Sequence, residues 1–214
     1  TGKNGVTAKV CSNAYSAGTS VNGDDNAAVG REAGQDVTGY GNAAIGVTAG
    51  TGVKGSRNFA GGWDAGSQVE GDDQIAIGTL AGQSVAGYSN IAVGNSAGYG
   101  VSGKENVALG TSTGMRVVGM ANVAVGSAAG NNTDGEGNAA IGMAAGQNVT
   151  GSYNLALGLS AGQFVWGKSN FAGGDNSGND VVGSSNIAIG SASGVRIRGR
   201  ENIAVGSAAG SEGI

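Results

Sequence analysis

The feature that most constrains this chain is a 16-residue repeat that runs without insertions through most of its 214 residues. Counted from an asparagine as position zero, each copy reads N-φ-A-φ-G-x-x-A-G-x-x-V-x-G-x-x, where φ is apolar. Repetition at a fixed period is typical of architectures in which equal units stack on one another. The twelve copies start at Asn26, Asn42, Asn58, Gln74, Asn90, Asn106, Asn122, Asn138, Asn154, Asn170, Asn186 and Asn202.

Three glycines per copy decide the secondary structure. They stand at positions four, eight and thirteen of every complete copy, and a glycine costs about 1 kcal/mol in a helix interior, which excludes a helical hairpin. Two short strands, N-φ-A-φ-G and x-x-V-x-G, joined by glycine turns fit the same length. We therefore predict an all-β chain, a parallel β-solenoid of about thirteen 16-residue coils with two short strands per coil.

The repeat also sets the predicted domain boundaries. Residues 1–9 precede it and are expected to form an irregular N-terminal cap, followed by a single repeat domain over 10–214 with regular copies from Asn26. Cys11 lies in the irregular first coil and is expected to be a partly buried cap residue.

Two copies depart from the consensus in the same way. Phe59 is followed by Gly61, and Phe171 by Gly173, where other copies have two aliphatic residues. Side chains alternate along a strand, so positions one and three share a face. A larger side chain beside a smaller one indicates volume compensation in one packed cavity. We therefore expect positions one, three and eleven to face the core.

On this interpretation, position two faces outward as a column of alanines. A uniform small apolar stripe suits close approach of another chain, and small rolls are stabilised by association. We expect a homo-oligomer interface here, the alternative being a monomer with a plain alanine face. The predicted interface residues are Ala28, Ala44, Ala60, Ala76, Ala92, Ala108, Ala124, Ala140, Ala156, Ala172, Ala188 and Ala204.

Composition narrows the function classes. The net charge of −4 argues against nucleic acid as the main partner, because phosphate binding needs a basic face. The chain has no histidine, the commonest general base and metal ligand, and its acids are scattered. The pairs Asp24-Asp25 and Asp72-Asp73 offer too few oxygens for a calcium site and are expected to be solvated turns. We predict that the chain is not an enzyme and binds neither a cofactor nor a metal ion.

Two groups of side chains are candidates for ligand binding at the outward positions of the second strand. Phe164 and Trp166 form an exposed aromatic pair suited to a protein or a glycan, the alternative being a chance surface hydrophobe. Arg196, Arg198 and Arg200 are suited to a sulfated glycan or an acidic protein, the alternative being a solvated band.

The repeat resembles that of a known family. The units NIAIGSASG (186–194), NIAVGSAAG (202–210) and NVAVGSAAG (122–130) are similar to the head repeat of YadA-like trimeric autotransporter adhesins, which runs close to N-S-V-A-I-G-x-x-S or A. The resemblance covers about residues 10–214. It implies a left-handed parallel β-roll and three chains around a threefold axis. Here the copies are uniformly 16 residues long, and the family's serine after asparagine is replaced by an apolar residue.

The resemblance also implies a function. It suggests the head of a bacterial cell-surface adhesin that attaches to host cells or to matrix proteins such as collagen, fibronectin or laminin, or to a host glycan. The sequence has no heptad stretch for a stalk and no barrel segment. We therefore interpret the chain as an exposed fragment of a cell-surface protein. Its only link to the outer membrane would be a C-terminal anchor that is missing from this sequence. The alternative function is a passive structural spacer that projects another binding domain from the cell surface.

Overall fold

The computed structural model describes residues 15–211, which form an all-β parallel β-solenoid with no helix. The described chain makes about eleven turns of about 16 residues each, fewer than the thirteen coils expected. The predicted cap at residues 1–9 and Cys11 lie outside the described residues. The chain divides into two compact units, the first ending at Lys104 and the second beginning at Glu105.

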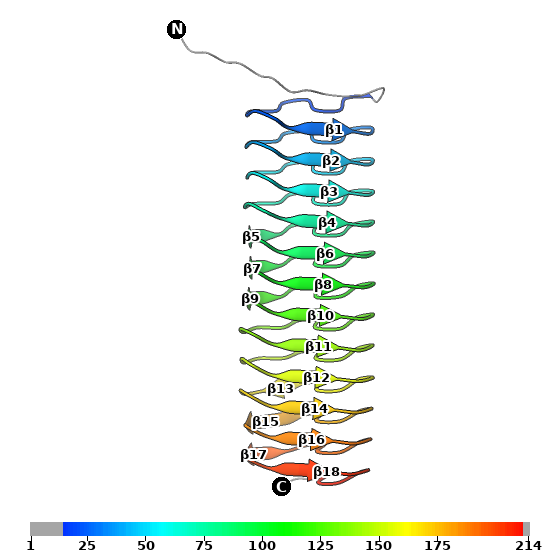
Figure 1. The fold of residues 1–214 in the computed structure, drawn as a ribbon, viewed down its shortest axis with the longest axis vertical. Helices are drawn as coiled ribbons and strands as arrows, with labels where there is room; N and C mark the ends of the chain where they lie inside the picture. Colours follow the sequence, from blue (N-terminus) through cyan, green and yellow to red (C-terminus); the bar gives the residue numbers. More distant parts are fainter. Residues whose placement is uncertain (1–14, 212–214) are drawn as a thin grey trace. The chain divides into compact units, whose positions relative to one another are not determined.

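In the first unit, one strand from each coil pairs in parallel with the same strand of the next coil (Figure 1). The partners are 16 residues apart, as in Ala28↔Ala44. The strands of this sheet are β1 (Ala27–Val29), β2 (Ala43–Ile45), β3 (Phe59–Gly61), β4 (Ile75–Ile77) and β6 (Ile91–Val93). On the return path of the coil, β5 (Ala86–Tyr88) pairs with β7 (Ser102–Lys104).

The second unit repeats this arrangement. Its main sheet contains β8 (Val107–Leu109), β10 (Val123–Val125), β11 (Ala139–Ile141), β12 (Leu155–Leu157), β14 (Phe171–Gly173), β16 (Ile187–Ile189) and β18 (Ile203–Val205). The return path carries β9 (Val118–Met120), and further along β13 (Val165–Trp166), β15 (Val181–Ser184) and β17 (Arg198–Arg200), which pair in parallel.

The predicted second strand is present in only some coils. In the others, a single bridge at position twelve joins neighbouring coils, as at Thr38↔Lys54 and Asp134↔Thr150.

Glycine at position thirteen explains the close stacking of neighbouring coils. Gly151 has a φ of 130°, and a Cβ there would overlap the carbonyl oxygen of Gly167 in the next coil. Only glycine allows this backbone-on-backbone contact.

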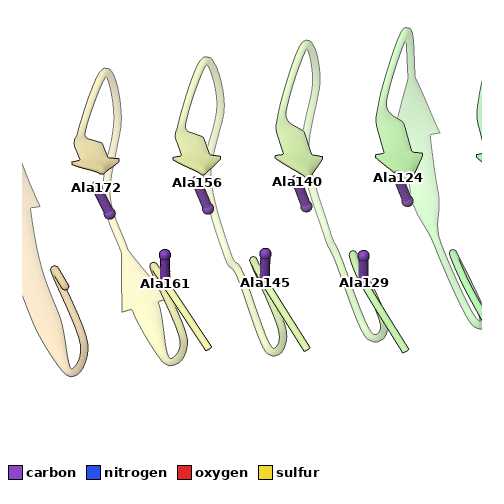
Figure 2. Packing of buried hydrophobic residues seen from close by; sticks show 7 residues of the cluster. All are labelled: Ala124, Ala129, Ala140, Ala145, Ala156, Ala161 and Ala172. Carbon is purple, nitrogen blue, oxygen red and sulfur yellow. The ribbon is translucent and has the colours of Figure 1, made fainter. Parts of the chain in front are cut away.

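The core is thin and consists mostly of alanine and valine. Alanines at position two point across the coil toward alanines at position seven, as Ala140 and Ala145 do in Figure 2. Position eleven supplies the rest of the core, for example Val149, Val165 and Val181. The inward orientation predicted for position eleven is confirmed.

The inward orientation predicted for positions one and three is wrong. Ile141 at position three is 44% exposed, whereas Ala140 beside it is 5% exposed. The physical reason is the width of the coil, because a Cβ on Gly146 would come within 2.6 Å of the Cβ of Ala140. The interior at that level has room for a methyl group and no more, so the large aliphatic side chains lie outside.

The alanine column is consequently core and is closed to a second chain. This corrects the predicted interface at Ala28, Ala44, Ala60, Ala76, Ala92, Ala108, Ala124, Ala140, Ala156, Ala172, Ala188 and Ala204, all of which are buried.

The pairing of phenylalanine with glycine is volume compensation, as predicted, but on the outer surface. A Cβ on Gly61 would lie 3.2 Å from Cε1 of Phe59, and one on Gly173 would lie 3.0 Å from Cζ of Phe171. Each ring therefore covers the place that a position-three side chain occupies in other coils.

Candidate functional site

A column of buried asparagines joins the coils. The side chain of Asn138 donates from Nδ2 to Oδ1 of Asn122 at 3.0 Å and to the carbonyl oxygen of Gly151 at 2.8 Å. Its own Oδ1 accepts from the backbone N and the Nδ2 of Asn154, both at 3.0 Å. These amide bonds form a ladder from coil to coil that serves the scaffold rather than a ligand.

The outer face of the main sheet is apolar in every coil of both units. In the first unit it consists of Ala27, Val29, Ala43, Ile45, Phe59, Ile75, Ile77, Ile91 and Val93. In the second unit it consists of Val107, Leu109, Val123, Val125, Ala139, Ile141, Leu155, Leu157, Phe171, Ile187, Ile189, Ile203 and Val205. We call these residues the apolar face of each unit. Soluble monomers rarely expose a continuous apolar surface of this kind, so the apolar face is a candidate interface.

The composition of positions one and three was a sequence signal for this face. Positions one and three never carry a polar or charged residue in twelve copies. An apolar column indicates burial, but a column in a thin solenoid can be buried either inside its own coil or against another molecule.

The opposite outer face, on the return path of the second unit, carries the predicted aromatic pair. Phe164 is 47% exposed and Trp166 is 46% exposed, with buried Val165 between them. Trp166 pairs in register with Val182, and Val182 with Arg198. Strands β13, β15 and β17 thus bring Trp166, Arg198 and Arg200 onto one small sheet. Phe164 directly precedes β13, and Arg196 lies two residues before β17.

The three arginines are exposed, and Ile197 between the first two is fully buried. The outward orientation predicted for Arg196 and Arg198 is therefore confirmed. Arg198 reaches back over β15, where Nη2 lies 3.1 Å from Oδ1 of Asp180 and Nη1 donates to the Asp180 carbonyl oxygen at 2.7 Å. Arg200 pairs in register with Ser184.

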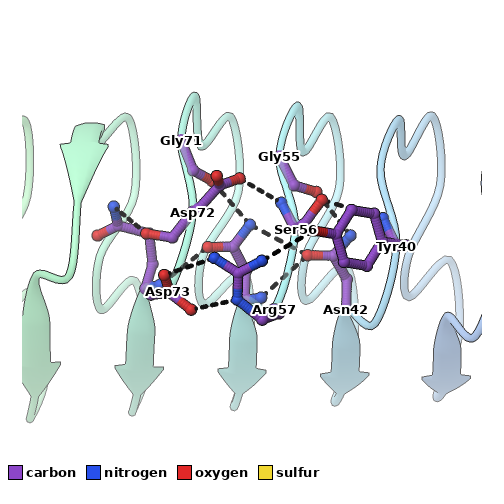
Figure 3. A network of polar contacts seen from close by, with 10 residues as sticks. Tyr40, Asn42, Gly55, Ser56, Arg57, Gly71, Asp72 and Asp73 are labelled. Carbon is purple, nitrogen blue, oxygen red and sulfur yellow. Dashed lines mark hydrogen bonds and ion pairs between the residues drawn. The ribbon is translucent and has the colours of Figure 1, made fainter.

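A polar network on the first unit joins three successive coils (Figure 3). Arg57 donates from Nε and Nη2 to the two carboxylate oxygens of Asp73 at 2.6 and 2.7 Å. Nη1 donates to the Tyr40 hydroxyl at 3.0 Å, and the guanidinium carbon lies 5.8 Å from the centre of that ring. Asp72 accepts from the backbone N of Ser56 at 2.7 Å. The Asp72-Asp73 pair is therefore a link between coils rather than a simply solvated turn.

These ion pairs shift the pKa of the acids involved. The hydrogen bonds from Arg57 hold the pKa of Asp73 below its ordinary value. Lys54, 2.7 Å from Glu70 in the next coil, likewise lowers the pKa of Glu70. Both pairs join residues 16 apart, which occupy the same repeat position in neighbouring coils. Opposite charges at that spacing were therefore a signal in the sequence for these ion pairs.

Other site types find no support in the described part of the chain. Within residues 15–211, no three side chains of His, Cys, Asp or Glu come together in a group that could hold a metal ion. The same residues include no helix long and apolar enough to cross a membrane.

Comparisons of the chain with protein-family models, with curated proteins and with solved structures return no match.

Proposed function

We propose that this chain is the self-associating, non-enzymatic head of a bacterial cell-surface adhesin. In this proposal, copies of the chain pack through the apolar face and bind host material through the opposite outer surface. The observation that carries the association is the run of exposed aliphatic side chains, such as Ile45 at 50% and Ile189 at 42% exposure. Burying such residues against a second copy removes apolar surface from water.

The phenylalanine–glycine pairs support a packed role for this face. Volume compensation matters where atoms are in close contact on both sides and has little consequence against open water. The rings of Phe59 and Phe171 fill the places that side chains at Gly61 and Gly173 would take, although both pairs lie outside the coil. A second copy is the occupant we favour, because an identical repeat presents the same apolar spacing to meet it.

The resemblance to YadA-like heads supports three copies around a threefold axis, display on the outer membrane and adhesion to host matrix. Three copies present each outward site three times, so weak individual contacts combine into strong attachment. The alternative function is a passive spacer, in which the same assembly only projects another binding domain.

The first experiment is the absolute mass of the chain in solution by light scattering. We expect about three times the 20.4 kDa of one chain. Ile141→Lys places a charge on the apolar face, and Thr150→Lys places the same charge on the opposite surface of the same unit. The first variant is expected to dissociate, and the second to keep the mass of the native protein. A monomeric native chain, or equal behaviour of the two variants, would contradict the assembly.

A second measurement distinguishes an adhesin head from a passive spacer. The assembled protein is applied to surfaces coated with collagen, fibronectin, laminin or sulfated glycan, with albumin as the control coat. Retention on one coat supports the adhesin, whereas retention on none supports the spacer.

A further inference from the structure

We propose that the sheet of β13, β15 and β17 in the second unit binds an anionic polysaccharide. Trp166 and Phe164 would contact the sugar rings, and Lys168, Arg198 and Arg200 would bind the sulfate or carboxylate groups. We call these five residues the glycan patch. It rests on the proposed function, because it names the class of ligand for the outward surface of the adhesin head.

The aromatic half of the glycan patch includes an aromatic side chain at a left-handed turn position of the coil. Phe164 has a φ of 56°, in the left-handed region that side chains of its size seldom adopt. The preceding and following coils place Asn148 and Asp180 there, and both residue types accept this conformation more readily. Position ten has a positive φ in every described coil, for example 54° at Arg116, so this backbone belongs to the repeat itself. What distinguishes this coil is the aromatic side chain, which is half-exposed beside an exposed tryptophan and so suits contact with a ligand.

The cationic half lies within two coils of the aromatic half. Residues 168–200 contain four basic residues and two acids, a net charge of +2 in a chain whose net charge is −4. Lys168 and Arg200 occupy position fourteen of coils that are two apart, which corresponds to about 10 Å at the ordinary strand spacing. Charge complementarity therefore favours an anionic ligand on an otherwise acidic protein.

Arg198 joins the two halves. Its guanidinium is held against Asp180, and the backbone N of Val181 donates to the carbonyl oxygen of Phe164 at 3.2 Å. Arg198 thus reaches to within one coil of the aromatic pair. Its side chain remains 54% exposed in this position, so part of the guanidinium fork stays open to an incoming anion.

The surrounding side chains suit a sugar polymer better than an acidic peptide. Thr150 lies in register beside Trp166, and Ser184 lies in register beside Arg200. Hydroxyl groups both donate and accept, which matches the hydroxyls of a sugar. A linear polysaccharide laid across successive coils would also meet equivalent positions at a constant interval.

The test measures binding of heparin, a sulfated polysaccharide, to the full chain at several salt concentrations, with neutral dextran as the control ligand. Trp166→Ala is expected to weaken binding about tenfold or more and to leave its salt dependence unchanged. Arg200→Gln is expected to weaken binding and to reduce the salt dependence. Trp63→Ala and Arg116→Gln remove an exposed tryptophan and an exposed arginine elsewhere, and they are expected to bind as the native protein does.

Three results would overturn the proposal. Equal losses of heparin affinity in Trp166→Ala and Trp63→Ala would show that heparin binds the protein surface non-specifically. Equal affinity for poly-glutamate would assign the patch to acidic protein instead. Absence of heparin binding in the native chain would remove the site altogether. The mass of every variant is measured alongside, so a monomer that still binds heparin contradicts the assembly and leaves the glycan patch standing.

Discussion

Asn154 donates a hydrogen bond from its side-chain Nδ2 to Oδ1 of Asn138 at 3.0 Å, and both residues are 6% exposed. The same oxygen accepts from the backbone N of Asn154 at 3.0 Å. Within the described residues, no buried side-chain nitrogen or oxygen lacks a partner. The asparagine column therefore places polar groups in a thin interior without the penalty that an unpaired amide would carry.

Removing one member of this column should be costly. Asn138→Ala deletes a side chain that makes four hydrogen bonds, and it leaves buried partners unpaired, each worth about 1–3 kcal/mol. We expect the free energy of unfolding to fall by about 3 kcal/mol or more, measured by chemical denaturation followed by circular dichroism. Asn95→Ala, which removes an exposed amide at a position without a positive φ, is the control and should change little. Equal losses in the two variants would refute a special role for the column.

Gln74 is a weak point in the column that can be repaired. Its Nε2 donates to the carbonyl oxygens of Gly87 and Asp72, at 2.6 and 3.2 Å, instead of to Oδ1 of Asn58. Gln74→Asn should restore the usual amide-to-amide bond and raise the free energy of unfolding by about 1 kcal/mol. The midpoint of urea unfolding reports this change. A lower midpoint would show that the longer side chain is itself the better fit.

The pairing of Phe171 with Gly173 predicts a rescue. Gly173→Val alone would place its Cβ 3.0 Å from the Phe171 ring and displace that ring outward. We expect this variant to lose about 1 kcal/mol of stability or part of its self-association. Adding Phe171→Ile recreates the ordinary apolar coil and should recover both quantities. Thermal unfolding and light scattering on the two variants measure the rescue, and a double variant no better than the single one would contradict volume compensation.

The Arg57–Asp73 pair predicts a pH effect with a definite sign. Arg57 lowers the pKa of Asp73 from its ordinary 3.8, so the pair stabilises the folded state above that pH. The contribution is lost as the pH falls through the lowered value of the folded protein. Arg57→Met should raise the pKa of Asp73 toward 3.8, as measured by NMR titration of its carboxyl carbon. Arg116→Met is the control, and an unchanged Asp73 pKa in Arg57→Met would contradict the assignment.

Much of the fold follows from the sequence. The 16-residue period, the parallel stacking and the inward valine at position eleven could all be predicted, because glycine turns and strand alternation act locally. The position of the asparagine column follows as well, since equal residues at a constant period stack on one another. The exposure of Phe164, Trp166, Arg196 and Arg198 was also predicted, from the alternation of side chains around the buried Val165 and Ile197.

The orientation of the first strand could not be predicted in this way. Positions one, two and three are all apolar, so alternation allows either face to point inward, and side-chain size favours the wrong one. Only the tertiary structure decided it, because the return path passes so close that Gly146 meets the methyl group of Ala140. That distance leaves room for alanine inside and sends Ile141 and its equivalents to the surface, where the apolar face becomes available to another chain.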